Sequence, residues 1–225
     1  ETSTSLRQAN FSSNIDSAVY YNKNRLFQNL AHHFSNDWNR WGISPPEGTD
    51  PALYMVSLDA EGEITNIPLY QGKQDANRVL QPPMENGTIT LTWEGGAGCD
   101  VRIGGDNISN RVNGAHSITY DYAGGSHWVT VEVTNNTAFL ANRPKKFQAY
   151  LLGENQSLRF APGEIAYLSQ FAGGRLMDLQ QTNHNSTTTR TVALRSLPTD
   201  RAYSFNGKTD GLSWEDIVLL ATLCN

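Results

Sequence analysis

Apolar residues along the chain follow two periods, and each period predicts its own kind of element. In residues 87–95, GTITLTWEG, the apolar residues Ile89, Leu91 and Trp93 alternate with three threonines. This alternation is typical of a half-buried β-strand. The stretches CDVRIGGDN, AHSITYDYAGG, HWVTVEVTN and RPKKFQAYLLG follow at short spacing, with glycine and asparagine turns between them. Many short strands at such spacing predict an antiparallel β-sandwich or jelly roll.

Three stretches have the period of a helix. We expect a short helix within residues 15–34, where apolar residues recur at helical spacing: Leu26, Phe27, Leu30 and Phe34. APGEIAYLSQFAGG predicts a second short helix that ends at its glycines. SWEDIVLLATLC predicts a third, with Ser213 as its cap and carboxylates in its first turn. Its expected apolar face consists of Ile217, Leu220 and Leu223.

These elements divide the chain into three expected parts. Residues 1–50 comprise a polar arm, over the first 15 residues, and a short helix. Residues 51–154 form the mostly β sandwich, beginning with two strands around the turn DAEGE. Residues 155–225 form a strand-loop-helix unit, in which RLMDLQQTN is a continuous apolar strand of the kind covered on both faces. A single such unit needs neighbours to bury its strand.

Composition and charge exclude several classes of protein. The net charge of −5 is spread thinly and no Lys/Arg run occurs, which argues against nucleic acid and anionic membranes as partners. No apolar stretch approaches the roughly 20 residues needed to span a bilayer. The first ten residues, ETSTSLRQAN, lack the pattern of a signal peptide. The numbering therefore begins at a mature terminus, or the protein is cytosolic.

Six Asn-x-Ser/Thr sequons favour a secreted, glycosylated protein over a cytosolic one. All six fall in stretches that predict turns or strand edges: Asn10, Asn86, Asn107, Asn135, Asn155 and Asn185. The alternative is chance occurrence in a chain rich in Asn, Ser and Thr. Cys99 and Cys224 are compatible with one disulfide in an oxidising compartment, with buried free thiols, or with a bond to another chain.

A few side chains are candidates for binding sugar. Asp178, Asn183 and His184 follow an expected strand and can hydrogen-bond a sugar hydroxyl, although a turn or capping role explains them equally well. Trp38 and Trp41 can stack on a pyranose ring, and core packing is the more common role for such residues.

Other chemistry is not indicated. The histidines do not form a pattern of metal ligands, so we expect no metal site. Nucleophile motifs are missing, and the glycine-rich turns lie between strands rather than before a helix, so we expect no cofactor.

Four stretches together resemble a family of secreted glycoside-hydrolase-like proteins, in which an amino-terminal β-sandwich leads into a (β/α)8 barrel. The stretches are NGTITLTWEGGAGCDVRIGGDN, HWVTVEVTNNTA, RFAPGEIAYLSQFAGGRLMDLQQTNHN and LSWEDIVLLATLCN. The matching positions are Trp93 to Gly95, Gly104 to Asp106, Phe160 and Pro162, Arg175 to Asp178, Thr182, Asn183, and Trp214 to Leu223. The likeness covers roughly residues 50–225. The chain departs from the family at Leu179, where the family has an aromatic residue, and in the loop HNSTTTRTVALRSLP.

The resemblance implies that GRLMDLQQTN is the first barrel strand, with its polar cluster at the carboxyl end where barrel enzymes build their sites. It also implies that the catalytic glutamates lie on later strands, in a second chain or in the remainder of the same precursor. Whether the protein is an enzyme is left open.

Three function classes follow. The first is a secreted glycoside hydrolase that acts on polysaccharide, of which this is the amino-terminal part. The second is a non-catalytic extracellular glycoprotein with a carbohydrate-binding or assembly role. The third is a viral capsid-type jelly roll, against which the absence of a basic amino-terminal arm counts.

Overall fold

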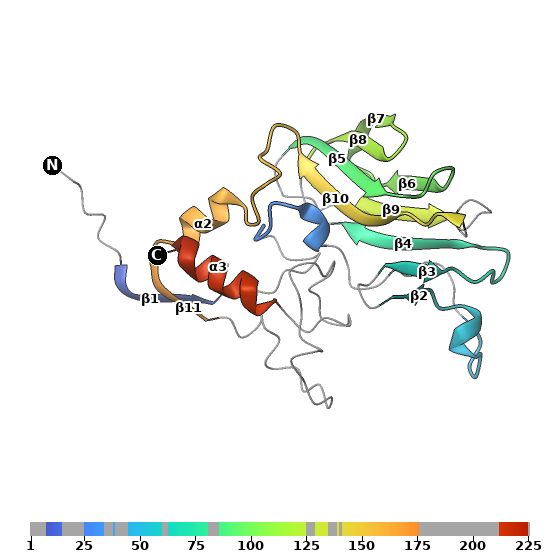
Figure 1. Cartoon of the computed structure of the whole chain (residues 1–225), viewed down its shortest axis with the longest axis horizontal. Coiled ribbons are helices and arrows are strands. Elements are labelled where there is room, and N and C mark those ends of the chain that lie inside the picture. Colours follow the sequence, from blue (N-terminus) through green and yellow to red (C-terminus); the bar gives the residue numbers. More distant parts are fainter. Residues whose placement is uncertain are drawn as a thin grey trace.

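The computed structural model describes residues 8–14, 25–33, 38, 45–59, 63–80, 86–124, 129–134, 139, 141–175 and 212–224. The described chain is mostly β, and most of its strands pair in antiparallel sheets (Figure 1). The predicted β class is therefore confirmed.

The largest sheet has four strands in the order β10-β5-β8-β7. Their bounds are Gly87–Glu94 for β5, Ile108–Asn113 for β7, Ser117–Tyr122 for β8 and Lys145–Leu151 for β10. In β5 and β8 every second side chain is buried, which confirms the alternation expected from the sequence. The edge strand β7 was not predicted, because its side chains are almost all exposed and polar and show no alternation.

A second antiparallel sheet has three strands in the order β4-β9-β6. Their bounds are Asp75–Leu80 for β4, Asp100–Gly104 for β6 and Val129–Thr134 for β9. The smaller pair β2 (Ser57–Leu58) and β3 (Ile64–Asn66) confirms the two strands predicted around DAEGE. A short 3-10 helix, η2 (Pro51–Leu53), precedes this pair.

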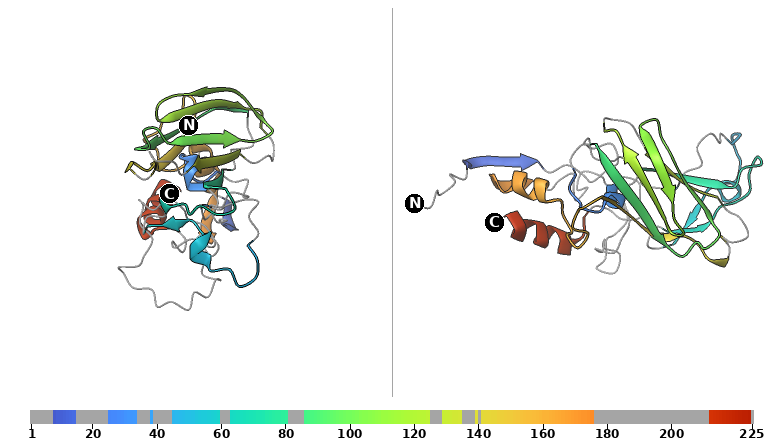
Figure 2. Two further views of the ribbon diagram at one scale, coloured as in Figure 1. Left: turned by 90° about the vertical axis from the view of Figure 1, so that its right-hand side faces the viewer. Right: turned by 90° about the horizontal axis from the view of Figure 1, so that it is seen from above.

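The four-stranded and three-stranded sheets share one apolar cluster. It draws Ile89 and Leu91 from the first sheet, Val131 and Val133 from the second, and Trp38 from the segment before them. Figure 2 shows these sheets lying one over the other, with α2 and α3 at the opposite end of the molecule. We call the assembly of β4 to β10 the two-sheet unit.

The strand β1 (Gln8–Asn14) pairs in parallel with β11 (Phe171–Arg175), although the two lie at opposite ends of the sequence. The expectation of a polar arm is therefore wrong for Gln8–Asn14. Gly173 and Gly174 also lie in a strand and not at a helix end, because their backbones pair with Ser12 and Ser13. The rest of the predicted strand, residues 176–183, lies outside the described residues.

Two helices accompany this parallel pair, and we call β1, β11, α2 and α3 the helical unit (Figure 1). The helix α2 (Pro162–Leu168) begins with proline at its first turn, where a missing N–H costs nothing, and ends just before β11. The helix α3 (Trp214–Cys224) confirms the predicted carboxyl-terminal helix.

A second apolar cluster packs α2 and α3 against the segments around Phe27 and Phe160. It contains Phe27, Phe160, Leu168 and Leu220, among other residues. Ile217 is partly buried against it, but Leu223 is 48% exposed, so the apolar face predicted for α3 is wrong at Leu223.

Within residues 25–33, the described part of the range 15–34, the predicted helix is present only as a short 3-10 helix, η1 (Leu30–His33). Phe27 instead forms an antiparallel bridge with Phe160, flanked by backbone hydrogen bonds from Gln28 to Arg159 and from Ala161 to Leu26. The apolar spacing predicted helical hydrogen bonds for this segment. Its backbone groups instead hydrogen-bond to a segment that is distant in the sequence. Residues 15–24 and 34 lie outside the described residues.

Candidate functional site

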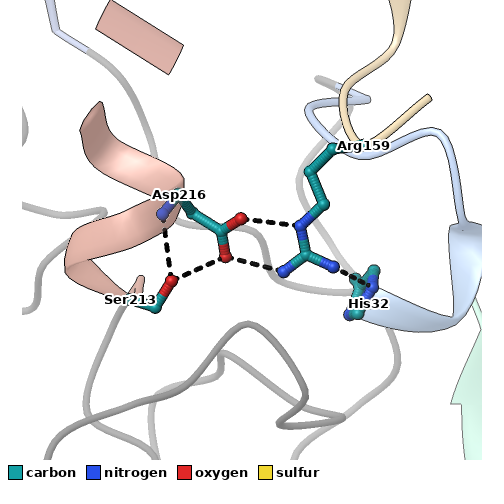
Figure 3. Close-up of polar contacts among 4 residues, drawn as sticks. All are labelled: His32, Arg159, Ser213 and Asp216. Atoms are coloured by element: carbon teal, nitrogen blue, oxygen red, sulfur yellow. Dashed lines mark hydrogen bonds and ion pairs between the residues drawn. The ribbon is translucent and has the colours of Figure 1, made fainter. Parts of the chain in front are cut away.

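The most developed polar cluster lies where the two units meet, and we call its four residues, His32, Arg159, Ser213 and Asp216, the polar joint (Figure 3). Arg159 donates from Nε and Nη2 to the two carboxylate oxygens of Asp216, at 2.7 Å and 2.6 Å. A paired geometry of this kind fixes direction as well as charge. The third nitrogen of the guanidinium, Nη1, lies 2.8 Å from Nε2 of His32. One arginine therefore ties α3 to η1.

The first turn of α3 presents Asp216 to this arginine. Ser213 precedes the helix, and its Oγ accepts the backbone N–H of Asp216 at 3.1 Å. The same hydroxyl donates to Oδ2 of Asp216 at 2.9 Å. The cap expected at Ser213 is thus confirmed. A carboxylate in the first turn also lies at the positive end of the helix dipole.

The Nε2 atoms of both histidines of η1 accept hydrogen bonds, so neither of these atoms carries a proton. His32 faces a guanidinium that can only donate, and therefore its Nε2 carries no proton. Nε2 of His33 accepts the backbone N–H of Phe27 at 3.2 Å. Burial, reinforced by the positive charge of Arg25, lowers the pKa of His33 to about 3.

A second ion pair lies beside the joint. Arg25 donates to both carboxylate oxygens of Glu154, at 2.5 Å and 2.6 Å, and also to the backbone oxygen of Gln28. The guanidinium of Arg159 additionally lies over the ring of Phe27, with Cζ 4.9 Å from the ring centroid. Arg25 and Arg159 therefore fix the segment before η1 against the loop that leaves β10.

The polar joint is built to hold its elements in place and not to transfer protons. Asp216 is buried, and its two oxygens receive the arginine and the serine hydroxyl. A carboxylate so engaged is a poor general base, and Arg159 stays charged at any pH the protein experiences. The arrangement favours a positioning role at the boundary of the two units.

Trp38 is a core residue. Its side chain is 3% exposed and its ring lies against Phe147, with ring centroids 5.4 Å apart. Of the two alternatives that the sequence left open, packing and sugar stacking, the structure favours packing. The other candidate sugar-binding residues, Trp41, Asp178, Asn183 and His184, lie outside the described residues.

The sequons differ in how their side chains are placed. Asn86 and Asn155 are exposed. Oδ1 of Asn155 accepts both the backbone N–H and the hydroxyl of Ser157, within its own sequon, which directs the opposite atom, Nδ2, away from the turn. Nδ2 of Asn107 instead donates to the backbone oxygen of Gly124 at 2.9 Å. Asn10 lies in β1, and Asn135 and Asn185 lie outside the described residues.

Both cysteines are free thiols in the structure, and they pack against different clusters. Cys99 lies at the edge of the cluster of the two-sheet unit, and Cys224 at the edge of the cluster of the helical unit. Burial raises the pKa of both thiols, so neither is activated as a nucleophile.

Within the described ranges, no three His, Cys, Asp or Glu side chains are grouped so that they would hold a metal ion. No helix in the described part of the chain is long and apolar enough to cross a membrane. Comparisons with models of protein families, with curated proteins and with solved structures find no match to this chain.

Only part of the polar joint could be predicted from the sequence. Ser213 and Asp216 carry the spacing of a helix cap, which is a local signal. Arg159 and His32 lie 127 positions apart and have no local signal at all, since only the bridge between Phe27 and Phe160 brings them together.

Proposed function

We propose that the chain is the amino-terminal portion of a secreted, carbohydrate-active glycoprotein that acts on or binds polysaccharide. In this proposal the catalytic glutamates lie on polypeptide outside this chain, and the helical unit is the start of a (β/α)8 barrel. The observation that carries the proposal is the parallel pairing of β1 with β11, together with α2 directly before β11 and α3 after it.

Parallel strands require a crossover connection, and that connection usually includes a helix. Here the crossover from β1 to β11 contains the whole two-sheet unit and then α2. The first barrel strand would accordingly be β1, and β11 would be the second. This differs from the sequence-based expectation, which began the barrel at GRLMDLQQTN.

The helical unit exposes apolar side chains that a longer parallel α/β structure would cover. On α3, Trp214 is 62% exposed and Val218 is 63% exposed. Parallel sheets occur almost only with both faces covered by helices and with further strands alongside. A two-stranded parallel sheet has little stability alone. These features support completion of the unit by further βα polypeptide, from the same precursor or from a second chain.

The two-sheet unit is the part of the chain that corresponds to the sandwich of the resemblance, although here it lies between β1 and β11 and not before every barrel strand. In the immunoglobulin arrangement, the second, fifth and fourth strands adjoin in one sheet and the third and sixth in the other. Counted from β4 as the first strand, β5, β8 and β7 adjoin in this way, as do β6 and β9. The first strand, β4, and the last, β10, however, occupy each other's places, since β4 adjoins β9 and β10 adjoins β5. The order therefore supports a two-sheet antiparallel arrangement and does not by itself separate a sandwich from a jelly roll.

A non-catalytic, carbohydrate-binding glycoprotein is the second candidate. It is favoured by the polar joint, where the buried carboxylate of Asp216 is fully engaged by Arg159 and Ser213. This class retains secretion, glycosylation and polysaccharide as a partner, and requires no glutamates on later strands.

Mass spectrometry of the protein from its natural source, combined with an assay of reducing-sugar release from polysaccharides, tests the proposal. We expect glycan mass at Asn86 and Asn155, peptides that continue beyond Asn225 or a co-purifying fragment, and sugar release. Unmodified sequons together with a single species of this length would overturn both secretion and the barrel. Glycosylated protein that releases no sugar would favour the second candidate.

A further inference from the structure

The outward positions of the two central strands of the four-stranded sheet carry mostly hydroxyl groups. On β5 and β8 the inward positions are apolar, whereas the outward positions form three cross-strand pairs: Thr88 with Asp121, Thr90 with Thr119, and Thr92 with Ser117. All six side chains are partly exposed. We call these six residues the hydroxyl face.

The hydroxyls of this face form a regular array. Along one strand, outward side chains lie about 6.8 Å apart, and neighbouring strands lie about 4.8 Å apart. Oγ1 of Thr90 lies 3.1 Å from Oγ1 of Thr119, so one of these hydroxyls donates to the other. A hydroxyl has one donor and two acceptor positions, and therefore this pair retains both a hydrogen and lone pairs for a ligand.

The one charged group on the hydroxyl face is already engaged. Thr88 donates to Oδ1 of Asp121 at 2.6 Å, and Nδ2 of Asn110 donates to Oδ2 at 2.7 Å. These bonds, that from Thr88 foremost, lower the pKa of Asp121, so its carboxylate stays ionised and fixes both neighbours. Asn110 reaches it from β7, where its backbone adopts a φ of 49° at an irregularity in the pairing with β8.

The opposite outer face, on the three-stranded sheet, has a different character. There Arg102 pairs with Asp100 and lies 3.7 Å from Glu132, and Asp75 adds another acidic group. Mixed charges of this kind are the usual covering of a solvent-facing sheet. The two sheets belong to one unit, so the scarcity of charge among the six residues, of which only Asp121 is charged, is a local property and not one of the whole chain.

The chemistry of the hydroxyl face selects one class of ligand. A nucleic acid or an acidic polymer needs cations, and the six residues include none. A protein partner needs a desolvated apolar or aromatic centre. The six residues offer none, and the apolar or aromatic side chains paired with them are the single exposed Val112 on β7 and the largely buried Tyr150 on β10. A neutral polysaccharide presents rows of hydroxyls that both donate and accept, and no net charge, which matches this surface.

We propose that the hydroxyl face is a binding surface for a neutral polysaccharide chain. The proposal rests on the proposed function in that it names the chemical class of the polysaccharide, but it requires no catalysis. The two-sheet unit would then hold the polymer while the chemistry takes place elsewhere.

Affinity electrophoresis of the 225-residue chain tests this surface directly. Native gels would contain mixed-linkage β-glucan or glucomannan as neutral probes, or polygalacturonate as the acidic probe. We expect the neutral polymers to retard the chain and polygalacturonate to leave its mobility unchanged. Retardation by polygalacturonate alone, or by none of the three polymers, would overturn the proposal.

A pair of matched variants locates the binding. Thr90→Val with Thr119→Val removes two hydroxyls at constant side-chain volume, and β-branched valine suits a strand. Loss of two neutral hydrogen bonds weakens binding about tenfold. The control, Thr130→Val with Thr134→Val, makes the same change on β9 of the other sheet and should bind as the unmodified chain does.

Thermal unfolding of both double variants shows whether each is folded, so a loss of binding cannot be mistaken for a loss of structure. Equal retardation of the Thr90/Thr119 variant and the control would refute the location. The outcome is independent of hydrolysis: binding by the 225-residue chain, with no sugar release by the protein from its natural source, rejects the enzyme and keeps the surface, and the reverse result rejects the surface alone.

Discussion

The two-sheet unit and the helical unit bury their apolar side chains to different degrees. In the two-sheet unit, residues such as Ile89, Leu91 and Val131 are fully buried in a cluster shared by two sheets. In the helical unit, α3 buries Leu220 but exposes Trp214 and Val218 on other faces. The first unit meets the requirements of a stable core from its own strands. The second has the secondary structure of a parallel α/β layer without enough partners to cover it.

This difference shows that the pattern of apolar and polar residues in a helix or strand reflects the surroundings that the element has in the complete fold. The alternation of β5 fits a sheet with one covered face and one solvated face, and it is covered in that way here. The helix α3 is apolar nearly all round, a pattern typical of a helix enclosed by protein. The polar joint then fixes α3 against the better-packed unit through Arg159.

The largest expected effect is a cavity in the two-sheet unit. Leu91→Ala removes a side chain that is 0% exposed and should lower the free energy of unfolding by about 4 kcal/mol. Leu220→Ala, in the half-open cluster of the helical unit, should cost about 2 kcal/mol because its surroundings can relax. Urea unfolding measures both. Equal costs would contradict the contrast between the units.

Acid should destabilise the segment that links the units. The pKa of His33 in the folded chain, about 3, lies below its ordinary value of 6.5, so the fold prefers the neutral form. Its contribution is fully present above about pH 6.5 and is lost as the pH falls toward 3. A pKa difference of one unit corresponds to about 1.36 kcal/mol, so the free energy of unfolding should fall by roughly 3 kcal/mol between pH 7 and pH 4.

His33→Gln supplies the matched control for this acid effect, because glutamine retains an acceptor and does not titrate. Urea unfolding between pH 7 and pH 4 should give a flatter dependence for this variant than for the unmodified chain. Identical slopes would show that His33 does not govern the acid response.

The polar joint should have a smaller effect. Asp216→Asn leaves the guanidinium of Arg159 without its charge partner, and we expect a loss of about 2 kcal/mol, since Arg159 is partly exposed. Arg102→Gln breaks an exposed ion pair on the three-stranded sheet and should change stability by less than about 0.5 kcal/mol. Urea unfolding measures both variants. If each lowered the free energy of unfolding by less than about 0.5 kcal/mol, the polar joint would not stabilise the fold more than an exposed ion pair does.

Local patterns predicted the central strands and α3, because burial of every second residue and a helix cap leave their mark within a few positions. The edge strand β7 left none, since its side chains face solvent. The pairing of β1 with β11 also left none: its hydrogen bonds join residues more than 150 positions apart, such as Ser12 and Gly173. Trp38 shows a further limit, because a tryptophan's identity does not tell a stacking platform from a core residue.

Backbone hydrogen exchange in the isolated chain tests the central contrast most directly. Amides of β5 and β8 should open only with global unfolding, whereas amides of β11 and α3 should exchange through local opening at much lower free energy. Equal protection of the two groups would mean that the helical unit is complete as it stands. The account of a barrel start that needs further βα polypeptide would then be wrong.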